Sequence, residues 1–310
     1  MTKWKHDPSK TVKEDLPAKF HDFYRGEHCN FMPTREETVC SSEEVEKHIL
    51  SGWTPDKPFI TKGDQILTFG SCFADSVQNY LRAKGYGIPD IHQCNITKYG
   101  AGMANTFTIR QQLEWAYGEG QFAAPDQWSY DPAAPPLHRL REDQEATRAL
   151  LDNTDVFVIT IGLSEIWCDR FNGYVFWKAV PGTTFDPDRH CFRVSTVKEN
   201  QDNLRRIIYL LRKHRPSAAI VFTLSPVSLL ATFRPISCIT ANCVSKSILR
   251  VAIDQTMSET HDDKVFYWPS YEIVTASSRY GFEDDHRHPK KETVTKIMDL
   301  FSKYYLIDGE

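Results

Sequence analysis

Short apolar runs alternate with amphipathic stretches from Gln65 to the C-terminus. The runs are apolar on both faces, which is typical of strands that helices cover from both sides. We expect five such strands, at residues 65–70, 87–94, 155–162, 218–224 and 264–268. The stretches between them place apolar residues at helical spacing. This alternation predicts an α/β fold, a three-layer α/β/α sandwich around a mainly five-stranded parallel sheet.

The first 62 residues differ from the rest of the chain. They mix charged residues, prolines and aromatics without a regular period, except for one helical patch at residues 42–50 with a serine cap and early carboxylates. Because so many aromatic side chains are costly to leave in water, we expect residues 1–62 to form an arm that wraps the main domain. The main domain then spans residues 63–310, with insertions near residues 118–140 and 167–194.

Composition and charge restrict the partners of the chain. The 37 Lys and Arg against 41 Asp and Glu give a formal net charge of −4, which offers no basic field to hold nucleic acid. The polar N-terminus lacks the apolar segment of a signal peptide, and no apolar run is long enough to span a membrane, so we expect a cytoplasmic protein. The eight cysteines form no CxxC pair. They therefore signal neither a zinc site nor a disulfide framework.

The first expected strand stops at Gly70-Ser71, and a helical pattern follows at once. A serine on this corner lies at the C-terminal edge of a parallel sheet, where open α/β sheets bind ligands, and at a helix N-terminus that favours developing negative charge. Both features suit a nucleophile. The alternative is that Ser71 is only a helix N-cap. Cys72 is a rival nucleophile, although a small buried thiol is the commoner outcome at a helix start.

A serine nucleophile needs a base, and the base needs a group that holds its tautomer. Asp285 and His288 lie three residues apart between the last expected strand and the last expected helix, on the same sheet edge as Ser71. They could supply both functions. The alternatives are a solvated acidic loop, or a metal bound by His286 and His288.

The segment Gly70-Ser71-Cys72-Phe73-Ala74 resembles the signature of the GSCFA domain family. Asp285-x-x-His288-Pro289 resembles the last block of the wider SGNH/GDSL hydrolase superfamily. The resemblance covers most of the chain and implies a flavodoxin-like three-layer α/β/α fold. It also implies that Ser71 is the nucleophile, His288 the general base and Asp285 its orienting carboxylate.

The resemblance also implies an oxyanion hole. In that superfamily the hole combines the N–H of the nucleophile, a glycine N–H after the second strand, and an asparagine in a Gly-x-Asn segment after the third. The segment Gly162-Leu163-Ser164-Glu165 stands where Gly-x-Asn is expected, and the asparagine is absent. Since such a donor is worth about 3 kcal/mol, an enzyme should replace it. The candidate donors are Ser71 itself, Gly100, Gly102, the positional stand-in Ser164, and the alternative amide Asn105.

Three further residues are candidates for binding the substrate. Glu165 could bind loop amides or a sugar hydroxyl, and a buried position would require a partner such as Arg170. Ser225 follows the fourth expected strand and either lines the cleft or caps a turn. Trp177, in the second insertion, could stack on a sugar ring, although packing explains it equally well.

These residues lead to one functional hypothesis and two alternatives. We expect a serine-dependent ester hydrolase that removes an O-acyl group, with acetyl favoured, from a carbohydrate-type ester through a Ser-His-Asp triad. This ester chemistry requires no metal or other cofactor, and its partner is a small-molecule or glycan ester. A carbohydrate O-acetyltransferase would use the same triad. A glycan-binding module that kept the fold and lost turnover with the missing asparagine is the other alternative.

Overall fold

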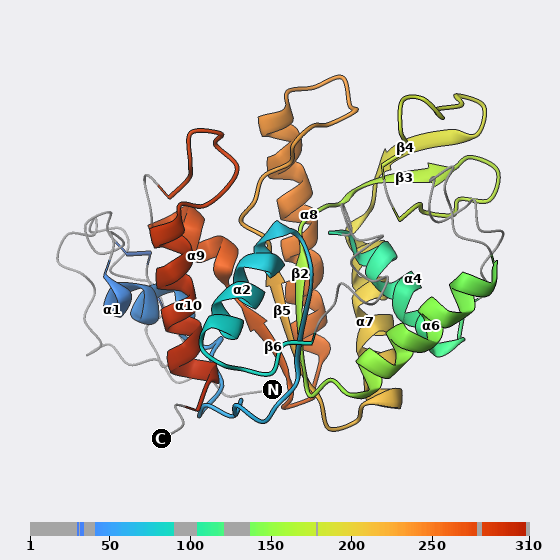
Figure 1. Ribbon diagram of the computed structural model, residues 1–310. Coiled ribbons are helices and arrows are strands. Elements are labelled where there is room, and N and C mark those ends of the chain that lie inside the picture. The colour runs from blue at the N-terminus through green and yellow to red at the C-terminus, as the bar shows by residue number, and fades with distance from the viewer. Residues whose placement is uncertain are drawn as a thin grey trace, which may run out of the picture.

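The computed structural model describes residues 30, 32–33, 41–89, 104–120, 137–177, 179–277 and 281–307 (Figure 1). Within this part of the chain, four parallel strands form one sheet in the order β1-β2-β5-β6. The strands are β1 (Ile66–Gly70), β2 (Val156–Ile161), β5 (Ala219–Leu224) and β6 (Val265–Trp268). The α/β prediction is confirmed, together with four of the expected strands.

The strand expected at residues 87–94 is the exception. Gly87 makes an isolated parallel bridge to Gln65, and its carbonyl accepts the Ile66 N–H at 2.8 Å. Pro89 follows directly and has no N–H to donate to a sheet. Residues 90–94 lie outside the described residues. The described sheet therefore has four strands where we expected five.

The two central strands are continuously apolar because both of their faces are covered. Every residue of β2 and of β5 is buried, and successive side chains point to opposite faces. Phe157 and Ile220 belong to one hydrophobic cluster, whereas Val156 and Val221 belong to the other. The sheet thus separates two cores, one under each helical layer.

Helices lie on both faces of the sheet (Figure 1). One core contains residues of α2 (Cys72–Ala83), α9 (Ser270–Ser277) and α10 (Lys291–Tyr305). The other contains residues of α4 (Thr106–Tyr117), α6 (Leu137–Asp152), α7 (Val197–His214) and α8 (Cys238–Glu259). These layers match the expected sandwich. No helix in the described ranges is long and apolar enough to cross a membrane.

The N-terminal segment from Ser41 to Ile60 contributes most of its buried side chains to the core on the α2 side of the sheet, whereas Trp53 packs against the other core. It contains α1 (Ser42–Val45), which begins with a capping box between Ser41 and Glu44, and a π-helical turn, η2 (Glu46–Leu50). Side chains of this segment that join the core are Val45, Leu50 and Ile60. Most of the predicted arm lies outside the described residues, so the boundary at residue 62 stays a prediction.

The chain after β2 adds a second, antiparallel sheet of two strands, β3 (Glu165–Asp169) and β4 (His190–Val194). It lies where the second insertion is expected and projects beyond the edge at which the parallel strands end (Figure 1). The first expected insertion, near residues 118–140, lies largely outside the described residues.

Candidate active site

The corner between β1 and α2 depends on a glycine. Gly70 has φ +128°, in the region that favours glycine, and a Cβ there would lie 1.9 Å from the carbonyl oxygen of Thr160. Ser71 follows as the N-cap of α2, where its Oγ accepts the Phe73 N–H at 3.2 Å. Strand β1 therefore ends where the backbone of β2 is too close to leave room for a side chain. The next residue, Ser71, presents a half-buried hydroxyl.

The hydroxyl of Ser71 meets a second serine from a distant part of the chain. Ser71 Oγ donates to Ser225 Oγ at 2.8 Å, and Ser225 is fully buried at the end of β5. Gly162, which follows β2, lies beside both, because a Cβ on it would be 3.5 Å from Ser71 Cβ and 3.4 Å from Ser225 Cβ. The ends of β1, β2 and β5 thus converge on Ser71, and Ser225 lines the candidate site as expected.

Asp285 and His288 form a tight pair in the loop before α10. Asp285 Oδ2 lies 2.5 Å from His288 Nδ1, and Oδ1 accepts the backbone N–H groups of His288 at 3.0 Å and Arg287 at 2.9 Å. These two backbone hydrogen bonds, with the imidazole contact, hold the pKa of Asp285 well below its usual range. A carboxylate at Nδ1 favours the tautomer in which Nε2 is the basic nitrogen. The pair has the arrangement that a general base and its orienting group require.

The loop itself is closed by the backbone. Glu283 N–H donates to the His288 carbonyl at 2.8 Å, and Lys290 N–H donates to the Gly281 carbonyl at 2.7 Å. His286 at its tip has φ +55°. The Asp285–His288 pair therefore lies on a short turn whose two arms are hydrogen-bonded together.

The loop before α10 and the start of α2 lie toward the same edge of the sheet, the upper edge in Figure 1. Arg287 Nε donates to the Ser228 carbonyl at 3.2 Å, which joins the loop of His288 to the segment that carries Ser225. No hydrogen bond joins Ser71 to His288, both of which are described. In this structure Ser71 donates to Ser225 instead.

A family comparison covers this whole arrangement. The model of the GSCFA family matches residues 65–301, from the start of β1 into α10. The chain belongs to the GSCFA family. The matched region contains the serine corner as well as the loop of Asp285 and His288. A search of curated proteins found no match.

Several solved structures are similar to this GSCFA chain at low identity. A structure described as a GDSL-like lipase from Parabacteroides merdae has 17% identity and a TM-score of 0.38, over 80% of this chain and 98% of that one. A carbohydrate esterase of family 3 from Talaromyces cellulolyticus has 9% identity and a TM-score of 0.35, over 77% and 94%. A family 3 carbohydrate esterase from Clostridium thermocellum has 12% identity and a TM-score of 0.31, over 79% and 95%.

Some of the expected oxyanion donors of this GSCFA chain already donate to other groups. Ser164 is fully buried, and its N–H and Oγ both donate to Ser245 Oγ, at 2.9 and 3.1 Å. Neither donor is left for a substrate, so the structure does not support Ser164 in this role. The Ser71 N–H is also in use, because it donates to the Thr160 carbonyl at 3.2 Å. Gly100 and Gly102 lie outside the described residues.

Asn105 is the expected donor that the structure leaves available. It is the N-cap of α4, and its Oδ1 accepts the Thr108 N–H at 3.0 Å, so that none of the described contacts uses its amide NH₂. The preceding residue, Ala104, accepts the Gly162 N–H at 2.6 Å. Since Gly162 lies against Ser71, this bond brings the start of α4 to the serine corner.

Two expected substrate contacts are corrected by the structure. Trp177 is 1% exposed, and its Nε1 donates to Gln111 Oε1 at 3.0 Å, so it fills the core and cannot stack on a ligand. Glu165 is buried, but its partners are Thr232 Oγ1 at 3.0 Å and Arg234 Nη1 at 3.8 Å. Arg170, the partner that we expected, lies instead near the His190 carbonyl.

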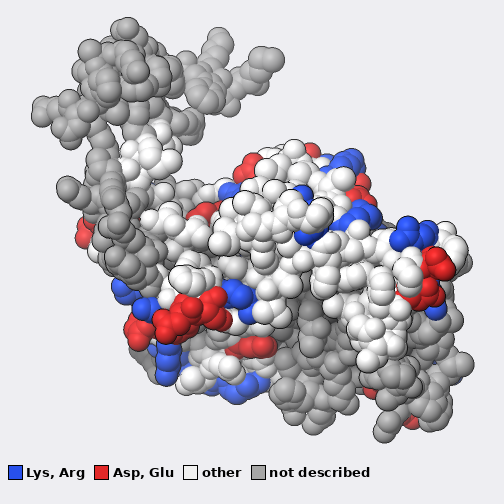
Figure 2. Space-filling model, turned by 90° about the horizontal axis from the view of Figure 1, so that it is seen from above, with Lys and Arg blue, Asp and Glu red and all other residues white. Residues whose placement is uncertain are grey.

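The segment that follows Ser225 exposes apolar side chains while its polar groups turn inward. Thr232 and Arg234 contact buried Glu165, whereas Leu230 and Phe233 are 78% and 60% exposed. Figure 2 looks down on the edge where the strands end, and uncharged side chains dominate the middle of this face. The segment that follows Ser225 therefore presents apolar side chains to solvent, which the sequence did not lead us to expect.

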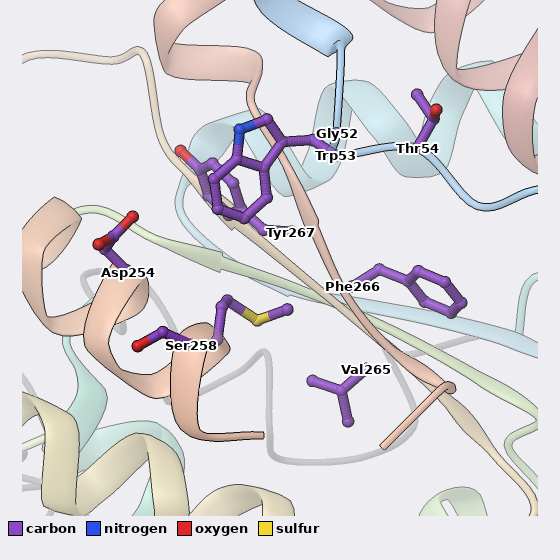
Figure 3. Close-up of a pocket in the computed structure, with 9 residues that line it drawn as sticks. Gly52, Trp53, Thr54, Asp254, Ser258, Val265, Phe266 and Tyr267 are labelled. Atoms are coloured by element: carbon purple, nitrogen blue, oxygen red, sulfur yellow. The ribbon is translucent and has the colours of Figure 1, made fainter. Parts of the chain in front are cut away.

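A separate pocket of about 310 Å³ lies against the edge strand β6 (Figure 3). Trp53 and Tyr267 meet there edge to face at 5.2 Å. The pocket also includes Asp254, from the second half of α8, and Val265 at the start of β6. It is lined by none of the expected site residues.

Proposed function

We propose that this GSCFA chain is a serine-dependent ester hydrolase with Ser71 as nucleophile, His288 as general base and Asp285 as the group that orients His288. The observation that carries the proposal is the Asp285–His288 pair, which three hydrogen bonds hold together on a loop that Arg287 joins to the segment following Ser225, the partner of Ser71. A serine, an imidazole and a carboxylate in these roles are the side chains that a Ser-His-Asp triad uses for acyl transfer.

In the first half of the proposed reaction, Ser71 Oγ attacks the ester carbonyl carbon. Its proton passes to His288 Nε2, and the Asp285 carboxylate stabilises the imidazolium that forms. The imidazolium then gives this proton to the leaving alkoxide, and an acyl-serine remains. In the second half, His288 takes a proton from water, the water oxygen attacks the acyl carbon, and Ser71 recovers its proton as the acid leaves.

Ser71 must exchange partners before it reacts. Its hydroxyl points to Ser225 Oγ at 2.8 Å, and a rotation about the Cα–Cβ bond is the movement that would redirect it to His288. The half-exposed His288, 42% accessible, sits on the loop that Arg287 ties to Ser228. We infer that substrate binding brings these two side chains together, since catalytic hydrogen bonds often tighten only in the complex.

Negative charge on the carbonyl oxygen needs donors in this scheme. We assign the Asn105 amide to that role, in place of the asparagine missing from the segment after β2. The N-terminus of α2 adds the positive end of a helix dipole at Ser71.

We propose that the substrate is an O-acyl ester of a carbohydrate, with acetyl as the acyl group. Acyl transfer to a sugar hydroxyl is the second candidate. Exposed Leu230 and Phe233, on the segment that follows Ser225, support this candidate, because an apolar boundary there would exclude water that competes with an acceptor.

The test is acetate release from p-nitrophenyl acetate, measured with and without a sugar acceptor. Wild type is compared with Ser71→Ala, and with Ser76→Ala as a matched control in the same helix. Release that depends on Ser71 supports the hydrolase, and acylated sugar formed at the expense of acetate supports transfer. Full activity in Ser71→Ala would refute Ser71 as the nucleophile. No turnover of several esters by wild type would leave the glycan-binding module as the better account.

A fluorophosphonate probe tests the nucleophile directly. The expected result is a mass shift on the peptide that contains Ser71, located on Ser71 itself. Labelling of Cys72, which is exposed one residue further along, would overturn the assignment.

A further inference from the structure

Lys246 lies inside the protein beneath the candidate site. It is on α8, is 1% exposed, and donates from Nζ to three backbone carbonyls. The acceptors are Gly162 at 3.0 Å, Ser225 at 2.8 Å and Val227 at 2.8 Å. An ammonium group has three N–H donors, so all of them are used. In the part of the chain that the structure describes, no carboxylate contacts Nζ.

Burial of an ammonium group without a carboxylate partner destabilises the fold more than burial of an apolar side chain. Transfer of a charge out of water costs free energy unless hydrogen bonds replace its hydration. Burial accordingly lowers the pKa of Lys246 to about 7, while the three carbonyl contacts act in the opposite direction because they favour the charged form. Leu249 and Ile253 lie on the same buried face of α8, where a leucine or methionine would fit the apolar pattern. The three contacts with carbonyl oxygens are therefore what a lysine provides at this position and a leucine or methionine does not.

The three carbonyls all belong to the segments that surround Ser71. Gly162 lies against Ser71 and Ser225, within 3.5 Å of each when a Cβ is placed on it. Ser225 Oγ accepts from Ser71 Oγ at 2.8 Å and from the Val227 N–H at 3.2 Å. A single cation thus joins the chain after β2 to the chain after β5 at the point where both meet the serine corner.

The geometry also defines what Lys246 does not do. Its Nζ contacts the carbonyl of Ser225 and not the hydroxyl. In its charged form all three N–H groups are directed at carbonyl oxygens, and none of the described contacts connects Nζ to the hydroxyl of Ser71. Lys246 is therefore no alternative to His288 as the base.

We propose that Lys246 is a positioning residue for Ser71, which acts by clamping the segments after β2 and β5 so that the backbone of Gly162 and Ser225 stays packed around the corner that carries Ser71. The kinetic consequence rests on the proposed function, whereas the clamp itself does not. Removal of the ammonium leaves three buried carbonyls without a donor, and the two segments then lose their common partner.

The test compares Lys246→Met with Lys264→Met. Lys264 is a matched control, because its Nζ also donates to a backbone carbonyl, that of Ser217 at 3.0 Å, but at the opposite end of β5. Amide hydrogen exchange is measured at residues 162–164 and 225–229. We expect faster exchange of both segments in Lys246→Met and no change in them in Lys264→Met.

Turnover of p-nitrophenyl acetate provides the second measurement. We expect kcat to fall about 10- to 100-fold in Lys246→Met with KM unchanged, because the nucleophile is misplaced while no substrate contact is removed. Lys246→Arg should not restore kcat, since a planar guanidinium cannot direct donors at three converging carbonyls. Amide exchange as slow as in the wild type at both segments of Lys246→Met would overturn the proposal. If the wild type is active, an unchanged kcat in Lys246→Met would also overturn it.

The two measurements separate this proposal from the proposed function. If the wild-type protein hydrolyses no ester, the proposed function is refuted. Amide hydrogen exchange then tests by itself whether Lys246 clamps the two segments. If Lys246→Met does not fold, Lys246→Gln, whose amide keeps two N–H donors, replaces it. Amide exchange rates in Lys246→Gln that lie between those of the wild-type and the unfolded protein at the two segments then support the clamp. Rates equal to those of the wild type refute it.

Discussion

Substitution of Gly70 by alanine tests how the serine corner is built. Two effects add in this variant. The backbone at φ +128° is unfavourable for any side chain, and the new Cβ would lie 1.9 Å from the Thr160 oxygen. Thr160 cannot move away easily, because its carbonyl accepts the Ser71 N–H and its strand is paired on both sides.

The magnitude follows from these two effects. A side chain at positive φ costs about 1–2 kcal/mol. Relief of the clash requires the end of β1 to separate from β2, which loses two or three backbone hydrogen bonds at about 1 kcal/mol each. We therefore expect Gly70→Ala to lower the free energy of unfolding by about 3–5 kcal/mol. Against a total stability of roughly 5–15 kcal/mol, the variant should fold but with Ser71 displaced.

The assay is urea unfolding of three alanine variants, followed by fluorophosphonate labelling of each. Gly182 has open space and no positive φ, so its variant measures the background effect. Gly85 has φ +81° and open space, so its variant measures backbone strain without a clash. Gly70→Ala should lose about 2–3 kcal/mol more than Gly85→Ala, from the lost hydrogen bonds alone, and should label far more slowly at Ser71. Equal stability of these two variants, or normal labelling of Gly70→Ala, would refute the reasoning.

Three further outcomes are expected. Asn105→Asp keeps a helix N-cap but replaces the amide donor, so kcat should fall about 100-fold, or about 3 kcal/mol, with unchanged melting temperature; an unchanged kcat would remove Asn105 from the oxyanion hole. Trp177→Ala should destabilise the fold by about 3–5 kcal/mol in urea, because Trp177 fills the core, and a loss near zero would return it to the ligand surface. The lowered pKa of Asp285 stabilises the fold fully above the unfolded pKa of about 4, and this contribution is lost as pH falls toward the lower folded pKa. Melts between pH 2 and 6 should thus show a shallower acid decline for Asp285→Asn than for wild type, and identical slopes would contradict the pairing.

The sequence by itself determined the features that depend on near neighbours in the chain. The strands β2 and β5 were predictable because burial on both faces demands a continuous apolar run. The serine corner was predictable because a strand that ends in Gly-Ser before a helical pattern is a local event. The Asp285–His288 pair was predictable for the same reason, since both residues belong to one turn.

Tertiary structure decided which distant residues share the site. Ser71 and Ser225 are 154 positions apart and meet because β1, β2 and β5 end at one edge. Glu165 pairs with Arg234 instead of Arg170, and Ser164 is bound by Ser245, because loops and helices after different strands close over that edge. The sequence period predicts which face of a helix or strand is apolar. It does not predict which other element packs against that face. The contacts of a polar residue such as Lys246 therefore follow only from the packing of the complete chain.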